Sequence, residues 1–533
     1  MKRVLCLFLV FGMLFSFSAC KPSGTHSDIS WKIEDGVLTV DGDGSIGDFC
    51  TDTQGLYAGT CYDSSAIPWY GLDYHTLVLG KGITYVSQHA FADAASLQKV
   101  IIQAERVEIE HGAFQNCSNL QEVANSERIA EMGEGAFENC SSLKSITLGE
   151  GFRFLLPSLP NLPENEFGSW FDGCSALESI EIDEDNSFIE SCDGVVYTDD
   201  MDTLIYYPMG KPEKTFVIPE TVDKIYQWAF AGAEYLEEIT ITGCRVMAEA
   251  FWSCPVLKTV VVGNDASIGP SCFEQCSALE SFRVDGDHPW FTVMDGVLYD
   301  SSQFETVGEL TLFCYPDGKK EKSFTVPKEV TQIQQNAFAG SGYLEYVDFA
   351  GEGITVIDPG VFRKCTSLKA VILPKSVTTI GEEAFYECTS LANVELPESI
   401  TTIGKRAFGD CTSLERIQLP ESVTSMGESA FSRCKSLKTI KIPGSISTIE
   451  SNVFFRCAAL ETVEISEGAN KISSDVFREC ESLKTIIIAQ SVTEISKFAF
   501  DEAPEDITIL CPKGSAAEEY AKSHGIRYIL QET

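Results

Sequence analysis

The sequence is poor in basic residues and in histidine. It holds 39 lysines and arginines against 79 aspartates and glutamates, and six histidines, so its formal net charge is −40. A surface of this sign repels phosphate backbones and anionic lipid headgroups. Nucleic acid is therefore excluded as a partner, and contact with a membrane is expected only through a covalent anchor.

The sequence also lacks the local motifs of common enzyme classes. No His-Glu-x-x-His, GxSxG, P-loop or CxxC pattern occurs. Residues 42–47 read GDGSIG, but the following residues do not open the helix that phosphate binding requires. The same stretch is not a calcium loop, since Ile46 stands where glycine is needed. We assign no catalytic residue, cofactor or metal ligand and predict a non-enzymatic protein; a hydrolytic site assembled across several coils is the alternative.

Long apolar runs are absent after the first twenty residues. Lys2 and Arg3 precede an apolar segment over 4–17, which predicts a signal peptide over 1–19. The segment FSAC that ends at Cys20 resembles a bacterial lipobox, although phenylalanine replaces the usual leucine. The resemblance implies lipidation of Cys20 and an extracytoplasmic, membrane-anchored protein at the cell surface, with residues 20–28 as a polar tether. Ordinary signal cleavage is the alternative.

The dominant feature that is present is a repeat of 23 residues. One unit, residues 384–404, follows the pattern AFxxCxSLxxVxLPxSVTxIG. A fixed period of this length predicts a solenoid whose coils bury their apolar faces against one another. LxxVxL is expected to form a strand with Leu391, Val394 and Leu396 inward, VTxI a second short strand, and AFxxC a helical or 3-10 turn. In the regular region the phenylalanines occupy positions 362, 385, 408, 431, 454, 477 and 500.

Most of the 20 cysteines belong to this repeat. Eleven of them follow a repeat phenylalanine by three residues, so stacking should place them in one buried column. Parallel Cβ vectors do not favour the torsion of a disulfide, and we predict free thiols. Cys50 and Cys61 lie outside the column and are the candidate disulfide pair. The eleven are Cys117, Cys140, Cys174, Cys254, Cys276, Cys365, Cys388, Cys411, Cys434, Cys457 and Cys480.

The chain divides into coils, caps and two inserts. We predict an N-terminal β cap (29–76), coils with a loop insert at 149–169 (77–182), a β insert (183–219), coils (220–284), a second β insert (285–327), regular coils (328–503) and a C-terminal helix–strand cap (504–533). The inserts match one another, because DGVVY and YPMGK in the first recur as DGVLY and YPDGK in the second. Each is expected to form a hairpin projecting from the solenoid edge.

The repeat, the segment around PWY at 68–70, the inserts and the terminal GSAAEEYAKSHGIRY resemble BspA-like leucine-rich-repeat surface proteins of bacteria. The resemblance covers almost all of the chain after the signal peptide. It implies an α/β, β-rich leucine-rich-repeat solenoid with a parallel sheet, here of about 15 coils by our count of units. It further implies a non-enzymatic module that binds host or bacterial surface proteins.

The inserts carry the aromatic side chains best suited to contact a ligand. These are Tyr197, Tyr207, Trp290, Phe291, Tyr299 and Tyr315. Packing of the inserts onto the solenoid explains the same residues equally well. The outward column of the regular strands, from Ile372 to Ile487, is mixed in character and predicts either a solvated face or part of a binding surface. An envelope scaffold or a glycan-binding protein are the alternative functions; the latter requires exposed, co-planar insert aromatics.

Overall fold

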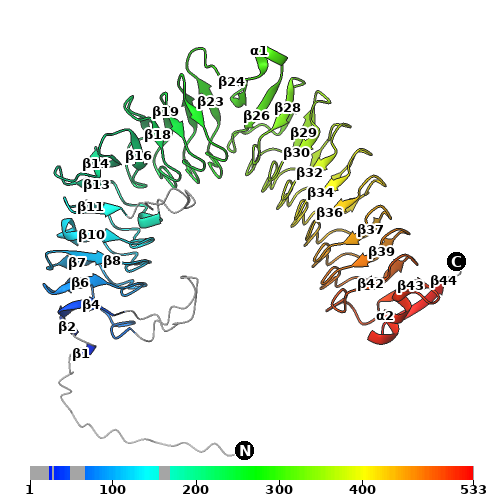
Figure 1. Ribbon diagram of the computed structural model, residues 1–533, viewed down its shortest axis with the longest axis horizontal. Coiled ribbons are helices and arrows are strands. Elements are labelled where there is room, and N and C mark those ends of the chain that lie inside the picture. The colour runs from blue at the N-terminus through cyan, green and yellow to red at the C-terminus, as the bar shows by residue number, and fades with distance from the viewer. Residues whose placement is uncertain (1–22, 27–28, 48–66, 155–168, 532–533) are drawn as a thin grey trace, which may run out of the picture.

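The computed structural model describes residues 23–26, 29–47, 67–154 and 169–531. Stacked coils follow one another in chain order and form an arch (Figure 1). Cys20, Cys50, Cys61 and most of the loop insert at 149–169 lie outside the described residues. Among the described residues, no helix has the length and apolar character needed to cross a membrane.

The N-terminal cap is a hairpin that continues directly into the coils. Its strands are β1 (Ser23–His26), β2 (Ile29–Glu34), β3 (Val37–Gly42) and β4 (Gly44–Ile46). Asp35 and Gly36 have φ values of 51° and 75°, as the predicted two-residue turn between β2 and β3 requires. β1 pairs antiparallel with β2, so the sheet of the cap includes residues of the predicted tether. β3 pairs in parallel with the first coil strand.

Each coil contributes strands to two parallel sheets. The prediction named one parallel sheet and a second short strand in each coil. Leu391 and Val394 are buried and Glu395 is exposed, which confirms the inward and outward positions, while Leu396 is half-buried. The LxxVxL strands are β5 (Thr76–Leu79), β7 (Lys99–Ile102), β9 (Glu122–Ala124), β11 (Ser145–Leu148), β13 (Ser179–Ile182), β17 (Thr215–Val217), β19 (Glu238–Ile241), β21 (Thr259–Val262), β23 (Ser281–Val284), β27 (Ser323–Val326), β29 (Tyr346–Phe349), β31 (Ala370–Val371), β33 (Asn393–Val394), β35 (Arg416–Ile417), β37 (Thr439–Ile442), β39 (Thr462–Ile465), β41 (Thr485–Ile488) and β43 (Thr508–Pro512).

The shorter strands of the second sheet come from VTxI and its equivalents. They are β6 (Ile83–Val86), β8 (Val107–Ile109), β10 (Ile129–Met132), β12 (Arg153–Phe154), β18 (Lys224–Ile225), β20 (Arg245–Val246), β22 (Ser267–Ile268), β28 (Val330–Ile333), β30 (Val356–Ile357), β32 (Thr379–Ile380), β34 (Thr402–Ile403), β36 (Ser425–Met426), β38 (Thr448–Ile449), β40 (Lys471–Ile472) and β42 (Glu494–Ile495). Two short 3-10 segments, Ser126–Arg128 and Ser169–Phe171, complete the first coils.

The AFxxC segments form consecutive tight turns, so the expectation of helical or 3-10 turns was wrong for the regular coils. Residues two before and two after the phenylalanine have left-handed φ values, for example 50° at Arg406 and 57° at Asp410, and these interrupt a helix. Hydrogen bonds between coils replace those of a helix. The amide of Phe408, for instance, donates to the carbonyl of Ala430 at 2.8 Å.

Aromatic rings stack along the axis and form the core. Phe408 lies between Phe385 and Phe431, with ring centroids 5.1 and 5.3 Å apart and interplanar angles of 2° and 3°. Each added coil thus extends an aromatic column as well as two sheets. Three stacks run Trp69–Phe91–Phe114–Phe137–Phe171, then Tyr207–Phe230–Phe251–Phe273, then Tyr315–Phe338 and onward through the seven regular phenylalanines.

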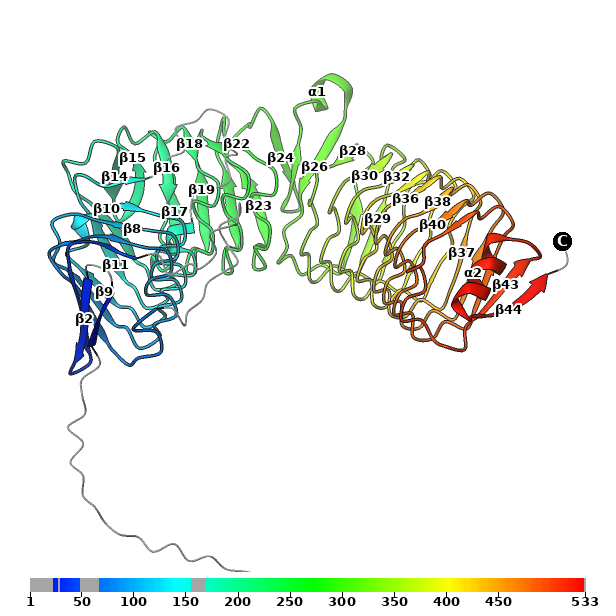
Figure 2. The ribbon, with the colours of Figure 1, turned by 60° about the horizontal axis from the view of Figure 1, so that its bottom comes forward.

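Each insert forms a three-stranded meander whose base is buried between coils. The prediction was a hairpin that projects from the edge of the solenoid. The third strand pairs in parallel with the next coil strand, so it belongs to the solenoid. Only the tip of the second meander, with the short helix α1 (Phe304–Val307), stands out from the body (Figure 2). The strands are β14 (Ile189–Cys192), β15 (Val195–Thr198) and β16 (Thr203–Tyr206), then β24 (Phe291–Met294), β25 (Val297–Asp300) and β26 (Leu310–Cys314).

The recurrence of YPxGK in the inserts has a structural explanation. The tyrosine starts a new aromatic stack, since Tyr207 packs on Phe230 at 4.8 Å. The lysine ties down the DG turn, because Lys211 Nζ donates to the carbonyl of Asp193 at 2.6 Å, and Lys319 binds that of Asp295 at 2.8 Å. The solenoid has about 19 turns, more than the 15 predicted, because cap and insert strands add turns that lack the phenylalanine signature.

The arch bends at the second insert, with the AFxxC turns on its inner side (Figure 1). On that side the coils before and after the insert touch directly, since Asn336 Nδ2 donates to Ser271 Oγ at 3.0 Å. The meander adds thickness on the other side, which closes the inner edge and opens the outer one. This geometry makes the residues around the AFxxC phenylalanines the concave face of the protein.

The C-terminal cap has the predicted form. Helix α2 (Ala516–His524) begins at Ser515, whose side chain accepts from the Glu518 amide, and ends at Gly525 with φ 68°. Strand β44 (Arg527–Gln531) pairs with β43 and covers the last coil. Tyr520 packs on Phe500 and ends the third stack.

Candidate binding site

Some charges on the concave face of the regular coils are paired between neighbouring coils. Arg406 pairs with Glu383 at 3.3 Å, and Arg456 with Glu479 at 2.6 Å. Each pair joins neighbouring coils, because the turn positions repeat with the period of the chain. Exposed pairs of this kind add little stability, but they engage part of the charge of this face.

Two aromatic side chains on this part of the face are covered by cations of the chain, whereas Tyr386, which directly follows Phe385, has none over its ring among the described residues. The guanidinium of Arg456 lies over the ring of Phe455 at 4.8 Å from its centroid, and Lys497 over Phe498 at 4.6 Å. Phe455 directly follows a stack phenylalanine, and Phe498 precedes one by two residues. These two turn positions therefore accept an aromatic ring with a cation upon it.

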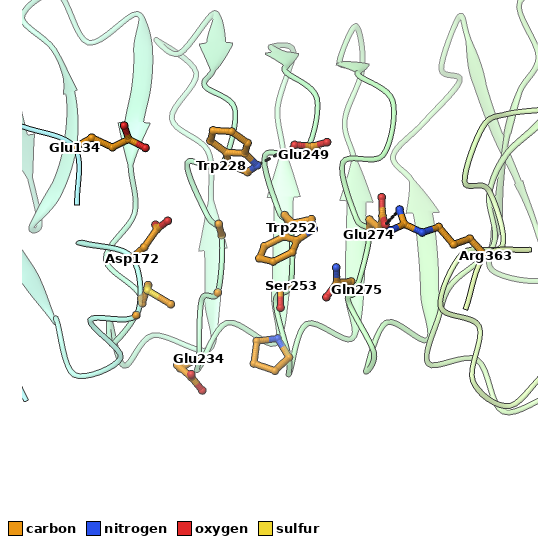
Figure 3. A pocket seen from close by; sticks show the side chains of 15 residues that line it. Glu134, Asp172, Trp228, Glu234, Glu249, Trp252, Ser253, Glu274, Gln275 and Arg363 are labelled. Carbon is orange, nitrogen blue, oxygen red and sulfur yellow. Dashed lines mark hydrogen bonds and ion pairs between the residues drawn. The ribbon is translucent and has the colours of Figure 1, made fainter. Parts of the chain in front are cut away.

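A hollow of about 860 Å³ interrupts the concave face between the coil of Phe137 and the bend. Trp228 and Trp252 stand in it on neighbouring coils, surrounded by carboxylates (Figure 3). Small residues leave the space open, since Ala231 and Gly232 follow Phe230 where most other coils carry larger side chains. Gly232 has a left-handed φ of 69°, which other residues rarely adopt, and the end of the Met209 side chain lies beside it.

The two tryptophans occupy the same turn positions as Phe498 and Phe455. Trp228 precedes Phe230 by two residues, and its φ is 59°. Its indole N–H donates to Glu249 Oε2 at 2.9 Å, which orients the ring. Trp252 directly follows Phe251 and is 39% exposed, a large fraction for its size. Neither tryptophan has a cation over its ring among the described residues.

The hollow carries five carboxylates and one guanidinium. Arg363 lies 3.7 Å from Glu274 and 3.4 Å from Glu383, so both of its charged neighbours belong to the chain itself. Burial raises the pKa of Glu274, and the Arg363 charge opposes that rise. The other four carboxylates have no ion pair within the described residues; they are Glu134, Asp172, Glu234 and Glu249.

Asp172 is the most perturbed of these groups. It is exposed by its accessible surface but set into the concave wall among other acids. Partial desolvation, followed by repulsion from Glu138 and Glu134, raises the pKa of Asp172 to about 6. Uncompensated negative charge beside open aromatic faces is suited to binding a cationic or amphipathic group.

The insert aromatics do not form this site. Tyr197, Tyr207, Tyr299 and Tyr315 are each at most 2% exposed, and Phe291 is 7% exposed. They pack the inserts into the solenoid, so the alternative of structural packing is the one observed for these five. Desolvation raises the pKa of Tyr207 and Tyr315 far above its usual range.

Trp290 alone among the insert candidates is accessible, at 42%, and it does not line the hollow. The co-planar exposed aromatics that a glycan site would have required in the inserts are not there.

Sequence reasoning missed Trp228 and Trp252. The available signal was a departure from the repeat, because most equivalent positions hold small or charged residues. Recognising it required knowing that these two turn positions face the inner side of an arch.

The repeat cysteines are buried free thiols, as predicted. Each thiol donates to the carbonyl of the stack residue on the preceding coil, as Cys411 does to Phe385 at 3.1 Å. Burial raises the pKa of Cys174 and of Cys480 to about 12, so these thiols are poor nucleophiles. Among the described residues no cluster of His, Cys, Asp and Glu is suited to hold a metal ion.

Comparison with known proteins identifies the repeat. Residues 69–158, 209–307, 298–394 and 378–505 match the model of the BspA type leucine rich repeat region, which is found in 6 copies. No curated protein matches the chain.

Similar solved structures are also leucine-rich repeat proteins. One, from Eubacterium ventriosum, is 20% identical, with 76% of this chain and 93% of that chain covered and a TM-score of 0.42. A leucine rich cell surface protein from Faecalibacterium prausnitzii is 19% identical, covers 94% and 97% of the two chains and has a TM-score of 0.28. The pneumococcal vaccine antigen PcpA is 14% identical, with coverages of 96% and 99% and a TM-score of 0.28.

Proposed function

The chain belongs to the BspA type leucine-rich repeat family, and from this we propose that it is a non-enzymatic, protein-binding module of the bacterial surface. It is held outside the cytoplasm by lipid at Cys20, and its partner is a protein of a host or of another bacterial surface. The partner docks on the concave face at the hollow around Trp228 and Trp252.

One observation carries the placement of the docking site. On the concave face of the regular coils, Arg406 and Arg456 pair with glutamates of neighbouring coils, and cations of the chain cover the rings of Phe455 and Phe498. The hollow leaves both kinds of group open, with Trp252 39% exposed. Open aromatic side chains in a concave region are typical of the residues that dominate protein interfaces.

The test is capture of a partner by the purified chain from residue 21 onward, immobilised through its C-terminus. Extracts of host cells and of neighbouring bacteria are passed over it, and bound proteins are identified by mass spectrometry. Replacing both Trp228 and Trp252 by alanine should raise the dissociation constant for the captured partner at least about tenfold, as expected when hot-spot residues are lost.

Phe498→Ala is the matched control, because Phe498 occupies the turn position of Trp228 and is 47% exposed, but lies in the last regular coil. The Phe498→Ala variant should capture as much partner protein as the unchanged chain does. Equal capture by the double variant would place the docking site elsewhere, and failure to capture any protein from either extract would refute protein binding.

A further inference from the structure

We propose that the hollow binds a lysine- or arginine-rich, extended segment of the partner, with a cationic side chain held against Trp228 and Trp252. This inference rests on the proposed function, since it names the chemistry of the segment that a docking protein would present.

The charge of the hollow selects against an anionic occupant. Glu134, Asp172, Glu234 and Glu249 have no ion pair among the described residues, and Arg363 is shared between two glutamates of the chain. An anionic peptide would meet four carboxylates that have no ion pair within the described part of the chain, and the one guanidinium of the lining is already shared between two glutamates. A cationic segment supplies the countercharges that the regular coils obtain from their own arginines and lysines.

The rest of the chain shows how such a cation sits. Arg456 covers Phe455 and Lys497 covers Phe498 at the two turn positions that the tryptophans occupy in the hollow. In both cases the cation is the next or the preceding residue of the chain. The neighbours of Trp252 are Phe251 and Ser253, and those of Trp228 are Gln227 and Ala229, so neither ring receives a cation from its own coil. A cation from outside completes the same arrangement.

The dimensions favour an extended segment over a single small molecule. The central part of the lining, from Asp172 on one coil to Glu274, spans four stack positions. At ~4.8 Å per coil this is a length of about 19 Å, which about six residues of extended chain would span. Alternate side chains of such a segment point the same way, so two or three of its basic residues can face the hollow.

The experiment uses fluorescein-labelled octalysine as the probe, with octaserine as its neutral counterpart, and the purified chain from residue 21 onward. Fluorescence anisotropy gives the dissociation constant at low salt. Trp252→Ala is expected to weaken octalysine binding about tenfold, as expected for loss of about 1.4 kcal/mol of cation–π interaction. The double variant Asp172→Asn, Glu249→Gln should weaken it to a similar degree without removing a ring.

A control is essential, because a chain with a formal charge of −40 attracts any polycation. The pair Glu398→Gln, Glu450→Gln removes the same charge from exposed positions of the regular coils and should leave binding unchanged within about twofold. The inference is overturned if the hollow variants bind octalysine as the unchanged chain does, or if the control pair loses as much as they do. Circular dichroism of each variant shows that the solenoid is intact.

The same probe separates this inference from the proposed function. If a captured protein is lost with the tryptophan variants but excess octalysine does not displace it, protein binding stands and the cationic segment is refuted. If octalysine binds at the hollow while no protein is captured, the chemistry of the hollow stands and the proposed function falls.

Discussion

Replacing Phe408 by alanine tests whether the aromatic stack is the main cohesive element of the regular coils. Phe408 is fully buried, and its ring lies between two others at 5.1 and 5.3 Å. Truncation of a buried phenylalanine to alanine costs about 3–5 kcal/mol, and the two stacked pairs account for about 1–3 kcal/mol of that sum. Phe408→Leu retains most of the apolar volume, so it should lose mainly the stacking contribution.

Hydrogen exchange measured by mass spectrometry is the suitable assay, because coils of a solenoid open locally and a single unfolding free energy is not defined for the whole array. The loss of protection should centre on residues 385–431 and leave the first stack, from Trp69 to Phe171, unchanged. A loss below about 1 kcal/mol at the substituted coil would contradict the assigned role of the stack. An equal loss of protection in the first stack would contradict the separation of the aromatic core into three stacks.

Three further predictions concern pH, thiols and the anchor. Octalysine affinity should fall as the pH is lowered from about 7.5 to 5, because the Asp172 carboxyl, with a pKa of about 6 beside Glu134 and Glu138, becomes neutral and the hollow loses negative charge; an affinity that rises on acidification would contradict this. Thiol titration should find one rapidly reacting cysteine among the described residues of the native protein, the exposed Cys192, and sixteen after denaturation, with two more only if Cys50 and Cys61 are not bridged; substantially fewer than sixteen would show that column cysteines are oxidised. Cys20→Ala should abolish incorporation of labelled palmitate and release the protein from the membrane fraction, whereas retention of the label would rule out Cys20 as the acylated residue.

Much of the coil followed from local pattern. The 23-residue period specified which residues repeat their environment, and apolar spacing specified which of them face inward, so Leu391, Val394 and the cysteine column were located correctly. The capping residues Ser515 and Gly525 marked the ends of α2, since capping depends on neighbours within one turn. The inserts were recognised as β-rich because strands and hairpin turns also depend on neighbouring residues in the sequence.

The errors arose where the outcome depended on contacts between distant segments. For Tyr207 and Tyr315 the sequence left ligand contact and packing equally open, and they start aromatic stacks because the third insert strand joins the coil sheet and turns them inward. The AFxxC segments do not form the predicted helical turns, because their amides donate hydrogen bonds to the next coil rather than within a helix. Neither effect can be recognised from spacing within one repeat.

The sequence by itself determined the family, the solenoid, the buried thiols and the acidic character of the surface, because these depend on composition and on a period that every coil obeys. The tertiary structure decided where the solenoid bends and which face becomes concave, because the second insert thickens one side while Asn336 and Ser271 touch on the other. That bend places the turn positions on an inner face, where Trp228 and Trp252 lie among carboxylates of several coils that have no ion pair within the described residues. A site assembled from single residues of successive coils has no contiguous motif, and only their stacking brings it together.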